Sequence, residues 1–534
     1  MPDTRTLVKQ GRTDELWTKF CGFFDLNPEE FRKIQERLLL EQIGLLGNSL
    51  MGRMLLGDVI PTSVEEFRNV VPITTYEDYK DFLDEKREDV LPRKPYGWSR
   101  TSGRSGEYKY KWIPYPEKMY DKLGEILLAT MILSTCSQRG EVNIALRSKV
   151  LLATAPPPYV TSFLSRSIRE MIDVRFLPPL EIGEEMDFAE RINIGIKMAM
   201  KDGLDYFYGV SSVLVAIGER IEKGSSGGFS PDMLHPLILW RYLKGFISSK
   251  IQKRPTLPKD LWNLKGIMVG GTDTDIYREK IGYYWGKDPV NGYGSTEGGA
   301  MAIQAWNRKG MTFSPETNFL EFLPQDELQK IEEDPDYQPK TLLYDELVPG
   351  IYELVFTNFH GGIFTRYRVR DMIEVISTRD DEVDINLPQF NFYSRSDGVI
   401  NLAGFAYLTE RDIWGAIQAT GIEYTDWVAR KEIIDDKAHL HLFVELKSPR
   451  DHEYDQIKKK IKQSLCDVNP DFADLESMLD YDALELELLN PGAFGAYMDY
   501  QQSHGADLAH TKPPHMKPTK KQLEVLLKDK KMKA

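Results

Sequence analysis

Residues 264–299 read LKGIMVGGTDTDIYREKIGYYWGKDPVNGYGSTEGG, and this stretch contains the pattern that decides the fold. It holds two strand candidates: residues 264–269, which a pair of glycines ends, and residues 288–293, which lead into a glycine-rich turn. A further candidate lies upstream at residues 148–153. Since strands of this kind alternate with helical segments along the chain, the sequence predicts an α/β core in which strands pair in parallel.

The second half of the chain indicates a change of architecture. Residues 351–357 and 371–377 are predicted to be successive antiparallel strands. Beyond Asp397 we expect a helix, two strands and a helix, at residues 409–419, 427–432, 438–446 and 453–466. We therefore predict a large N-terminal domain over residues 1–396 and a smaller α+β domain over residues 397–534.

The composition argues against several classes of protein. With 68 basic and 82 acidic residues, the chain has a formal net charge of −14, which makes it a poor general nucleic-acid binder. No apolar run approaches the roughly 18 residues of a membrane span, and no apolar signal segment is recognisable. The cysteines form no CxxC pair, so neither a disulfide framework nor a zinc site is indicated. We expect a cytoplasmic protein, monomeric or weakly dimeric, with no nucleic-acid or membrane partner.

The first candidate site is a loop crowded with glycines and hydroxyls, TSGRSGEYK at residues 101–109. Glycines let the backbone approach an anion, and amide and serine groups can donate hydrogen bonds to phosphate oxygens. A nearby lysine adds a positive charge. The loop is not a Walker loop, because Glu107 follows Gly106 where that motif requires lysine. A purely structural turn is the alternative interpretation.

The second candidate is the segment NGYGSTEGG at residues 291–299. Tyr293 could stack on a base and Thr296 could bond a phosphate. Glu297 offers the hard oxygen that Mg²⁺ prefers. A strand-to-loop turn with a glutamate on the surface is the alternative.

Two further candidates follow a run of arginines. Asp371, after FTRYRVR, could accept two hydrogen bonds from the hydroxyls of a ribose, or form a salt bridge with one of the three preceding arginines. Arg395 could reach nucleotide oxygens. Asp397-Gly398, just beyond it, is turn chemistry that suits a hinge, although an ordinary turn is equally compatible.

The last candidate is Lys512, which precedes two prolines near the end of the chain. The prolines restrict the shape of its loop. A lysine held in this way could stabilise charge on a phosphorus centre. A solvated loop lysine is the alternative.

The order of these segments resembles the adenylate-forming superfamily. TSGRSGEYK is similar to its phosphate loop, YGSTE to its Tyr-Gly-x-Thr-Glu segment, YRVRD to its Arg-Thr-Gly-Asp segment, and SRSDGVINLAG to its hinge segment. Within that superfamily the chain resembles the auxin-responsive acyl acid amido synthetases more closely. The motifs are VPITTYEDY at residues 71–79, FLEFLP at 319–324, PQFNFYSR at 388–395 and GAFGAYMDYQQSHGADLAHTKPP at 492–514. The resemblance spans roughly residues 35 to 515.

The resemblance implies a large N-terminal adenylation domain with mixed sheets and a β-barrel-like part, followed by a smaller, mobile α+β lid domain. It also assigns ATP and Mg²⁺ to named residues. Glu297 would hold the metal and act with Lys512, which would close over the adenylation site. Asp371 would bind ribose and Arg395 would lie near the nucleotide. The other nucleotide contacts would come from Ser102, Gly103, Arg104, Ser105, Gly106, Lys109, Gly271, Thr272, Tyr293, Gly294, Ser295 and Thr296, with Tyr293 stacked on adenine.

Three residues depart from the family pattern. Arg104 replaces a small hydroxyl residue in the phosphate loop, Arg370 replaces the glycine before Asp371, and Thr511 stands where the family has tyrosine. Because the carboxylates and Lys512 are present, we expect an active ATP-dependent ligase.

The implied activity is conversion of a small carboxylic acid to an acyl-adenylate, followed by transfer of the acyl group to an amine such as an amino acid. Two alternatives stay open. Coenzyme A could be the acceptor, or the chain could be a nucleotide-binding homologue with weakened catalysis. The sequence does not distinguish one acyl acid from another, nor does it identify a base for the amine.

Overall fold

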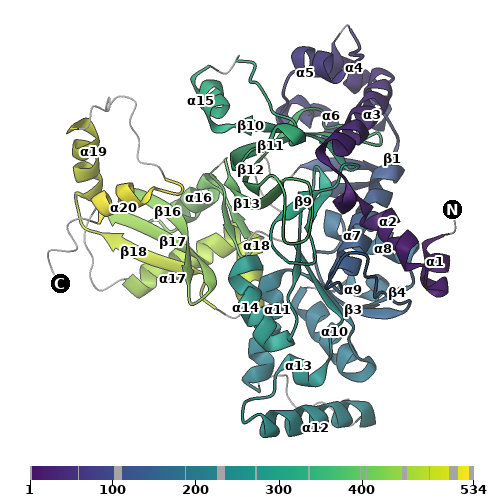
Figure 1. The fold of residues 1–534 in the computed structure, drawn as a ribbon. Coiled ribbons are helices and arrows are strands. Elements are labelled where there is room, and N and C mark those ends of the chain that lie inside the picture. The colour runs from purple at the N-terminus through teal and green to yellow at the C-terminus, as the bar shows by residue number, and fades with distance from the viewer. Residues whose placement is uncertain are drawn as a thin grey trace. The chain divides into compact units, whose positions relative to one another are not determined.

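The computed structural model describes residues 3–57, 59–101, 111–186, 188–224, 235–270, 274–334, 337–396, 398–404, 406–447, 454–479, 481–503 and 515–527. Several sites predicted from the sequence lie outside these ranges, namely residues 102–110, Gly271, Thr272, Asp397 and Lys512. The described residues up to Ser396 form one compact unit and those beyond Asp397 form a second. Each unit is described by itself (Figure 1).

One mixed sheet forms the centre of the first unit. In the described residues it has eleven strands in the order β10-β11-β12-β13-β9-β8-β7-β6-β5-β3-β4. The parallel half comprises β3 (Ser148–Ala153), β4 (Val174–Leu177), β5 (Tyr206–Gly209), β6 (Gly266–Gly270) and β7 (Val290–Ser295). This half confirms the parallel α/β core that the opening stretch predicts.

The antiparallel half continues the same sheet. It comprises β8 (Gly299–Gln304), β9 (Met311–Phe313), β10 (Asn318–Pro324), β11 (Gly350–Asn358), β12 (Tyr367–Ser377) and β13 (Gln389–Arg395). The resemblance implies a β-barrel-like part somewhere in the N-terminal domain; the strands of this half are continuous with the parallel half. Strand β7 is the junction, because it pairs in parallel with β6 and antiparallel with β8.

Some helices of the first unit precede the sheet in the chain and others lie between its strands. A separate hairpin of β1 (Pro95–Arg100) and β2 (Trp112–Pro116) flanks the predicted phosphate loop. The helices are α1 (Thr4–Gln10), α2 (Thr13–Phe20), α3 (Pro28–Gly47), α4 (Leu50–Leu56), α5 (Val64–Val70), α6 (Lys80–Leu83), α7 (Glu117–Leu133), α8 (Val160–Met171), α9 (Leu180–Gly183), α10 (Phe188–Asp202), α11 (Ser211–Glu222), α12 (Pro236–Ile251), α13 (Pro258–Leu261), α14 (Thr274–Trp285) and α15 (Gln325–Glu333). In the part of the chain that is described, no helix is both long and apolar enough to traverse a bilayer.

Helix α7 explains where the core of the first unit lies. Its apolar residues are buried almost along its whole length, and it packs against α8 and against strand β8. Gly299, at the start of β8, has a φ of +71°, and a Cβ there would lie 2.9 Å from a methyl carbon of Leu123. Close packing at this glycine holds the β7–β8 turn against α7.

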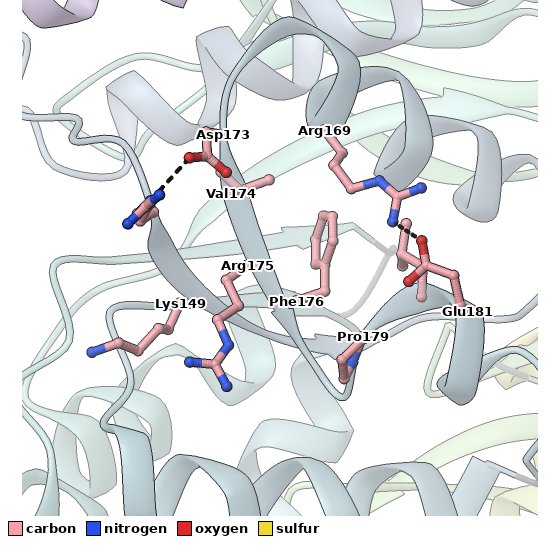
Figure 2. A pocket seen from close by; sticks show the side chains of 10 residues that line it. Lys149, Arg169, Asp173, Val174, Arg175, Phe176, Pro179 and Glu181 are labelled. Carbon is pink, nitrogen blue, oxygen red and sulfur yellow. Dashed lines mark hydrogen bonds and ion pairs between the residues drawn. The ribbon is translucent and has the colours of Figure 1, made fainter.

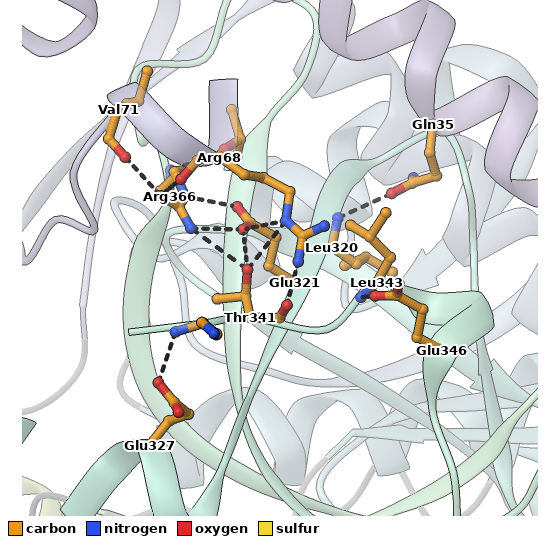
Figure 3. Close-up of polar contacts among 12 residues, drawn as sticks. Gln35, Arg68, Val71, Leu320, Glu321, Glu327, Thr341, Leu343, Glu346 and Arg366 are labelled. Carbon is orange, nitrogen blue, oxygen red and sulfur yellow. Dashed lines mark hydrogen bonds and ion pairs between the residues drawn. The ribbon is translucent and has the colours of Figure 1, made fainter. Parts of the chain in front are cut away.

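Buried arginines hold strand β12 in place. The guanidinium of Arg366 donates to both carboxylate oxygens of Glu321 on β10, at 2.9 and 3.0 Å, and to the backbone oxygen of Val71 at 2.6 Å (Figure 3). Arg368 forms the same fork with Glu353 on β11, at 2.6 and 2.8 Å. Removing one member of such a buried pair leaves an uncompensated charge, which costs about 3–5 kcal/mol. These arginines therefore set the register of β12.

The second unit has its own sheet and core. Strands β16 (Tyr424–Ile434) and β17 (Lys437–Leu446) are antiparallel, and β18 (Leu484–Leu489) pairs in parallel with β17. The remaining elements are β14 (Ile400–Leu402), β15 (Ala406–Leu408), α16 (Glu410–Ala419), α17 (Tyr454–Val468), α18 (Pro470–Leu479), α19 (Ala493–Ser503) and α20 (Lys520–Leu526). The helix–strand–strand–helix order expected beyond Asp397 is present.

Candidate functional site

Three motifs that are distant in the chain meet at Glu297. Glu297 lies in the turn between β7 and β8, and its side chain is buried. The ammonium nitrogen of Lys111, just before β2, lies 3.0 Å from its Oε1 atom. The hydroxyl of Tyr367, at the start of β12, donates to the same oxygen at 3.1 Å, and Lys111 also contacts this hydroxyl at 3.0 Å. The three side chains form a closed triangle of polar contacts.

The charges of this triangle follow from its burial. Burial raises the pKa of Glu297, but the neighbouring Lys111 charge and its hydrogen bond outweigh that effect, and the net pKa is lowered. Burial and the Glu297 charge together raise the pKa of Tyr367 well above its usual value. Glu297 is therefore an ionised carboxylate, and Tyr367 is a neutral hydrogen-bond donor.

Side chains from other elements hold the β7–β8 turn. Tyr115 donates to the backbone oxygen of Thr296 at 2.6 Å, and Asn358 donates to that of Glu297 at 3.1 Å. The hydroxyl of Ser295 accepts from the backbone nitrogen of Gly298 at 2.9 Å. The Ser295 side chain therefore stabilises the turn. Contacts of Gly294, Ser295 and Thr296 with a nucleotide stay predictions.

A second cluster lies on the neighbouring strands, around Asp371. Tyr293 on β7 donates to Oδ2 of Asp371 at 2.8 Å, and Arg395 on β13 donates to Oδ1 at 2.8 Å. The salt bridge that the sequence left open for Asp371 is present, but its partner is Arg395. The preceding Arg366 and Arg368 pair with glutamates of β10 and β11.

The side chain of Tyr293 is largely buried. It is 8% exposed, and its ring meets the edges of Phe313 and Phe390 at centroid distances of 6.2 and 5.8 Å. Burial and the Asp371 charge raise the pKa of its hydroxyl. Sequence reasoning missed this contact with Asp371. Stacking of Tyr293 on adenine stays a prediction.

The two clusters belong to one electrostatic environment. The Glu297 charge adds to the rise in the pKa of Tyr293, and the Arg395 charge contributes to the fall in the pKa of Glu297. Glu297 and Asp371 are therefore held within the same unit and near the same groups. The structure brings together four predicted residues: Tyr293, Glu297, Asp371 and Arg395.

Lys111 and Tyr367 are residues of the site that the sequence analysis missed. The sequence analysis favours Lys109 in place of Lys111, and Lys109 lies outside the described residues. Thr101 and Lys111, the residues on either side of the predicted phosphate loop, bind each other: the backbone nitrogen of Thr101 donates to the Lys111 oxygen at 3.1 Å, and that of Lys111 donates to the Thr101 hydroxyl at 3.0 Å. The two ends of the loop are thereby held beside Glu297. The sequence signal that could have pointed to Lys111 is the alternation of two lysines, Lys109 and Lys111, just before the segment that forms β2.

Arg370 has a backbone conformation that favours glycine. Its φ is +67°, in the left-handed region that favours glycine. The backbone from Arg368 to Met372 lies opposite only Val355 to Glu353 of β11, so β12 bulges at this point. The backbone oxygen of Arg370 accepts from the Ser396 nitrogen at 2.8 Å. The substitution is accommodated, and the bulge leaves Asp371 facing Arg395.

A cavity of about 520 Å³ lies elsewhere, at the edge of the sheet along β4. Figure 2 shows its basic side chains, several of them facing acidic ones. Arg147 pairs with Asp173 at 3.3 Å, and Arg169 pairs with Glu181. None of the residues predicted to bind nucleotide lines this cavity. The cavity is therefore separate from the candidate site.

Three models of one family match successive segments that together cover more than half of the chain. The GH3 family N-terminal domain matches residues 22–155, the central domain residues 311–395 and the C-terminal domain residues 413–521. The chain belongs to the GH3 family. This confirms the family expected from the motifs, and the central match contains the arginines of β12, Asp371 and Arg395.

Two curated GH3 relatives are similar over part of their length. A probable indole-3-acetic acid-amido synthetase of Oryza sativa subsp. japonica is 28% identical over 38% of this chain and 36% of its own length. A 4-substituted benzoates–glutamate ligase of Arabidopsis thaliana is 24% identical over 40% of this chain and 38% of its own length. The matched region thus spans little more than a third of either relative.

Two solved structures share the GH3 chain's fold. An acyl acid amido synthetase in complex with 2,4-DB superposes with a TM-score of 0.50 at 17% identity, covering 98% of this chain and 96% of that one. A 2-hydroxyisobutyryl-CoA ligase in its thioesterification state superposes with a TM-score of 0.52 at 13% identity, covering 94% of each chain. The two structures show that this chain has a mixed α/β fold.

Proposed function

We propose that this GH3 chain is an ATP-dependent ligase that converts a small carboxylic acid to an acyl-adenylate and transfers the acyl group to an amino acid, forming an amide. The two curated relatives are named as an amido synthetase and an acid–glutamate ligase. The observation that carries the proposal is the meeting of Lys111, Glu297 and Tyr367 beside Tyr293, Asp371 and Arg395. This arrangement combines a lysine at the end of a glycine-rich loop with two buried carboxylates.

In the first step, a carboxylate oxygen of the acid attacks the α-phosphorus of ATP. An oxygen–phosphorus bond forms, the bond to the bridging oxygen breaks, and pyrophosphate leaves with the electron pair. The task of the protein is to orient the two reactants and offset charge on the phosphates. Lys111 would donate to phosphate oxygens, and Asp371 would accept from the ribose hydroxyls.

A Mg²⁺ ion fits this donor set if it arrives with the nucleotide. Glu297 is an ionised, buried carboxylate, and Mg²⁺ is commonly held by one or two carboxylates together with substrate phosphates. Within the described ranges, no cluster of three or more acidic, histidine or cysteine side chains could hold a metal alone. When bound, the ion would neutralise charge on the phosphates.

The second step would use the C-terminal unit as a lid. We place the hinge at Asp397 and assign Lys512 to the adenylation step, with domains at residues 1–396 and 397–534. An amine would attack the acyl carbon, the carbon–oxygen bond would break, and AMP would leave. We further propose that the enzyme works in the cytoplasm as a monomer or weak dimer; the free cysteines Cys21, Cys136 and Cys466 are compatible with a reducing compartment.

ATP–pyrophosphate exchange across a panel of carboxylic acids tests the adenylation step. Exchange that depends on one class of acid supports the proposal. Offering amino acids and coenzyme A to the trapped acyl-adenylate then decides the acceptor, because an amide and a thioester differ in mass. ATP binding without exchange for any acid would instead support a homologue with weakened catalysis.

A further inference from the structure

Helix α12 exposes a row of large apolar side chains. The exposed fractions are 64% for Trp240, 57% for Leu243, 50% for Ile247 and 75% for Ile251. These residues follow one another at intervals of three or four, so they form a single stripe along the helix. Leu237, Leu239 and Phe246 widen it and are also about half exposed. Figure 1 shows α12 at one end of the first unit, next to α13.

The opposite face of α12 attaches the helix to the protein. Ile238, Gly245 and Ser249 are buried there. The guanidinium of Arg241 donates to the backbone oxygens of Met200 and Leu261, at 3.0 and 2.9 Å. The helix is therefore anchored through a narrow face, and its wider apolar stripe is exposed. An amphipathic helix in a globular protein normally has the reverse orientation.

Positive charge accompanies the exposed stripe. Between Pro236 and Arg254 the chain has five basic residues and no acidic one, although its net charge is −14. Arg254 pairs with Asp260 and Arg241 binds backbone oxygens, so the charges that accompany the stripe are those of Lys244, Lys250 and Lys253. Lys244 lies over the ring of Trp240 and Lys250 over that of Phe246, with the nitrogens 5.9 and 5.3 Å from the ring centroids. The two lysines flank the stripe on opposite sides. Lysines beside an apolar face can extend their charged ends to lipid headgroups.

We infer that α12 is an interfacial helix that docks this protein onto an anionic lipid surface. The apolar stripe would enter the boundary between headgroups and acyl chains, and Lys244 and Lys250 would contact anionic headgroups. A second copy of the chain is a poorer occupant, because a two-fold contact would place two basic helices against each other. Such docking requires no membrane-spanning segment, but it replaces the expectation from the sequence that the protein has no membrane partner.

Sedimentation of the full chain with vesicles tests this inference. We expect binding to vesicles of equimolar phosphatidylcholine and phosphatidylglycerol, and binding weaker by about tenfold or more to phosphatidylcholine alone. Replacing the stripe in the variant Leu243→Ser/Ile247→Ser/Ile251→Ser should abolish binding. The control Trp414→Ser/Ile433→Ser removes exposed apolar side chains of the second unit and should bind as the wild type does.

A second pair of variants tests whether vesicle binding requires the charges of Lys244 and Lys250. Lys244→Gln/Lys250→Gln should weaken binding to the anionic vesicles by about tenfold or more. The control Lys33→Gln/Lys309→Gln removes the same charge from exposed lysines elsewhere and should have a much smaller effect. Equal losses in both pairs would indicate attraction by overall charge and would overturn a specific role for α12.

Fluorescence locates the contact. Bromine-labelled lipids should quench tryptophan emission of the wild type on binding, and part of that quenching should be lost in Trp240→Phe. If neither vesicle type binds, or if binding persists when the stripe is replaced, the inference is wrong. Light scattering that shows a dimer, dissociated by the stripe variant and accompanied by no vesicle binding, would assign the face to self-association. Because every readout is binding, these outcomes are independent of the ligase activity.

Discussion

Lys111 and Glu297 form a buried ion pair at 3.0 Å although 186 positions separate them in the chain. The pair connects the end of the predicted phosphate loop to the turn between the parallel and antiparallel halves of the sheet. Tyr367 completes it from β12. This contact makes the candidate site one unit, and it leads directly to the first prediction.

Replacing Lys111 by methionine should lower the rate of ATP–pyrophosphate exchange by about a hundredfold or more, because one preorganised donor to developing charge is typically worth that factor. It should also destabilise the fold by about 3 kcal/mol, because Glu297 loses the partner of its buried charge. Exchange kinetics and urea unfolding measure the two effects. In the double variant Lys111→Met/Glu297→Gln most of the stability should return while activity stays low. A double variant no more stable than Lys111→Met would contradict the pairing.

The stability of the protein should depend on the charge of Glu297 in acid. The folded state holds the pKa of this carboxyl below its ordinary value of 4.5. A lowered folded pKa contributes stability that is fully present above the ordinary value and is lost as the pH falls through the folded value. The free energy of unfolding should therefore fall more steeply with acidification in the wild type than in Glu297→Gln. Equal slopes for the two proteins over this acid range would refute the prediction.

Substitutions of Asp371 and Tyr293 should change different properties: the first the KM for ATP, and the second the stability of the fold. Asp371→Asn should raise the KM for ATP by about tenfold to a hundredfold, since hydrogen bonds to a charged group are worth about 1.5–3 kcal/mol. Tyr293→Phe removes only the hydroxyl that donates to Asp371, so it should destabilise the fold by about 1–2 kcal/mol without raising that KM. Steady-state kinetics and thermal unfolding distinguish them. A large rise in KM for Tyr293→Phe would show that its hydroxyl serves the nucleotide.

The left-handed backbone at Arg370 should be measurable as strain. Arg370→Gly and Arg370→Ala both remove the side chain, but only glycine adopts a φ of +67° without a steric penalty. The glycine variant should be more stable than the alanine variant by about 1 kcal/mol. Chemical denaturation of the two variants provides the comparison. An alanine variant as stable as the glycine variant would mean that this backbone relaxes freely.

Much of the fold could be predicted from local patterns. Residues 148–153 form β3 as predicted, and the two strands of residues 351–377 are antiparallel. These patterns are the alternation of apolar and polar residues and the positions of glycine pairs and prolines. They extend over only a few residues, and such short-range preferences decide where helices and strands begin and end. The family could also be recognised, because it depends on the order of motifs along the chain.

Only the tertiary structure decided which partners the polar residues have. From the sequence, Asp371 could have paired with any of the three arginines that precede it. In the structure Arg366 and Arg368 pair with glutamates of β10 and β11, and Asp371 pairs with Arg395. The apolar residues of α12 could equally have been a buried face. Partner choice and exposure depend on which strands and helices become neighbours. That is a property of long-range packing, which no local pattern in the sequence contains.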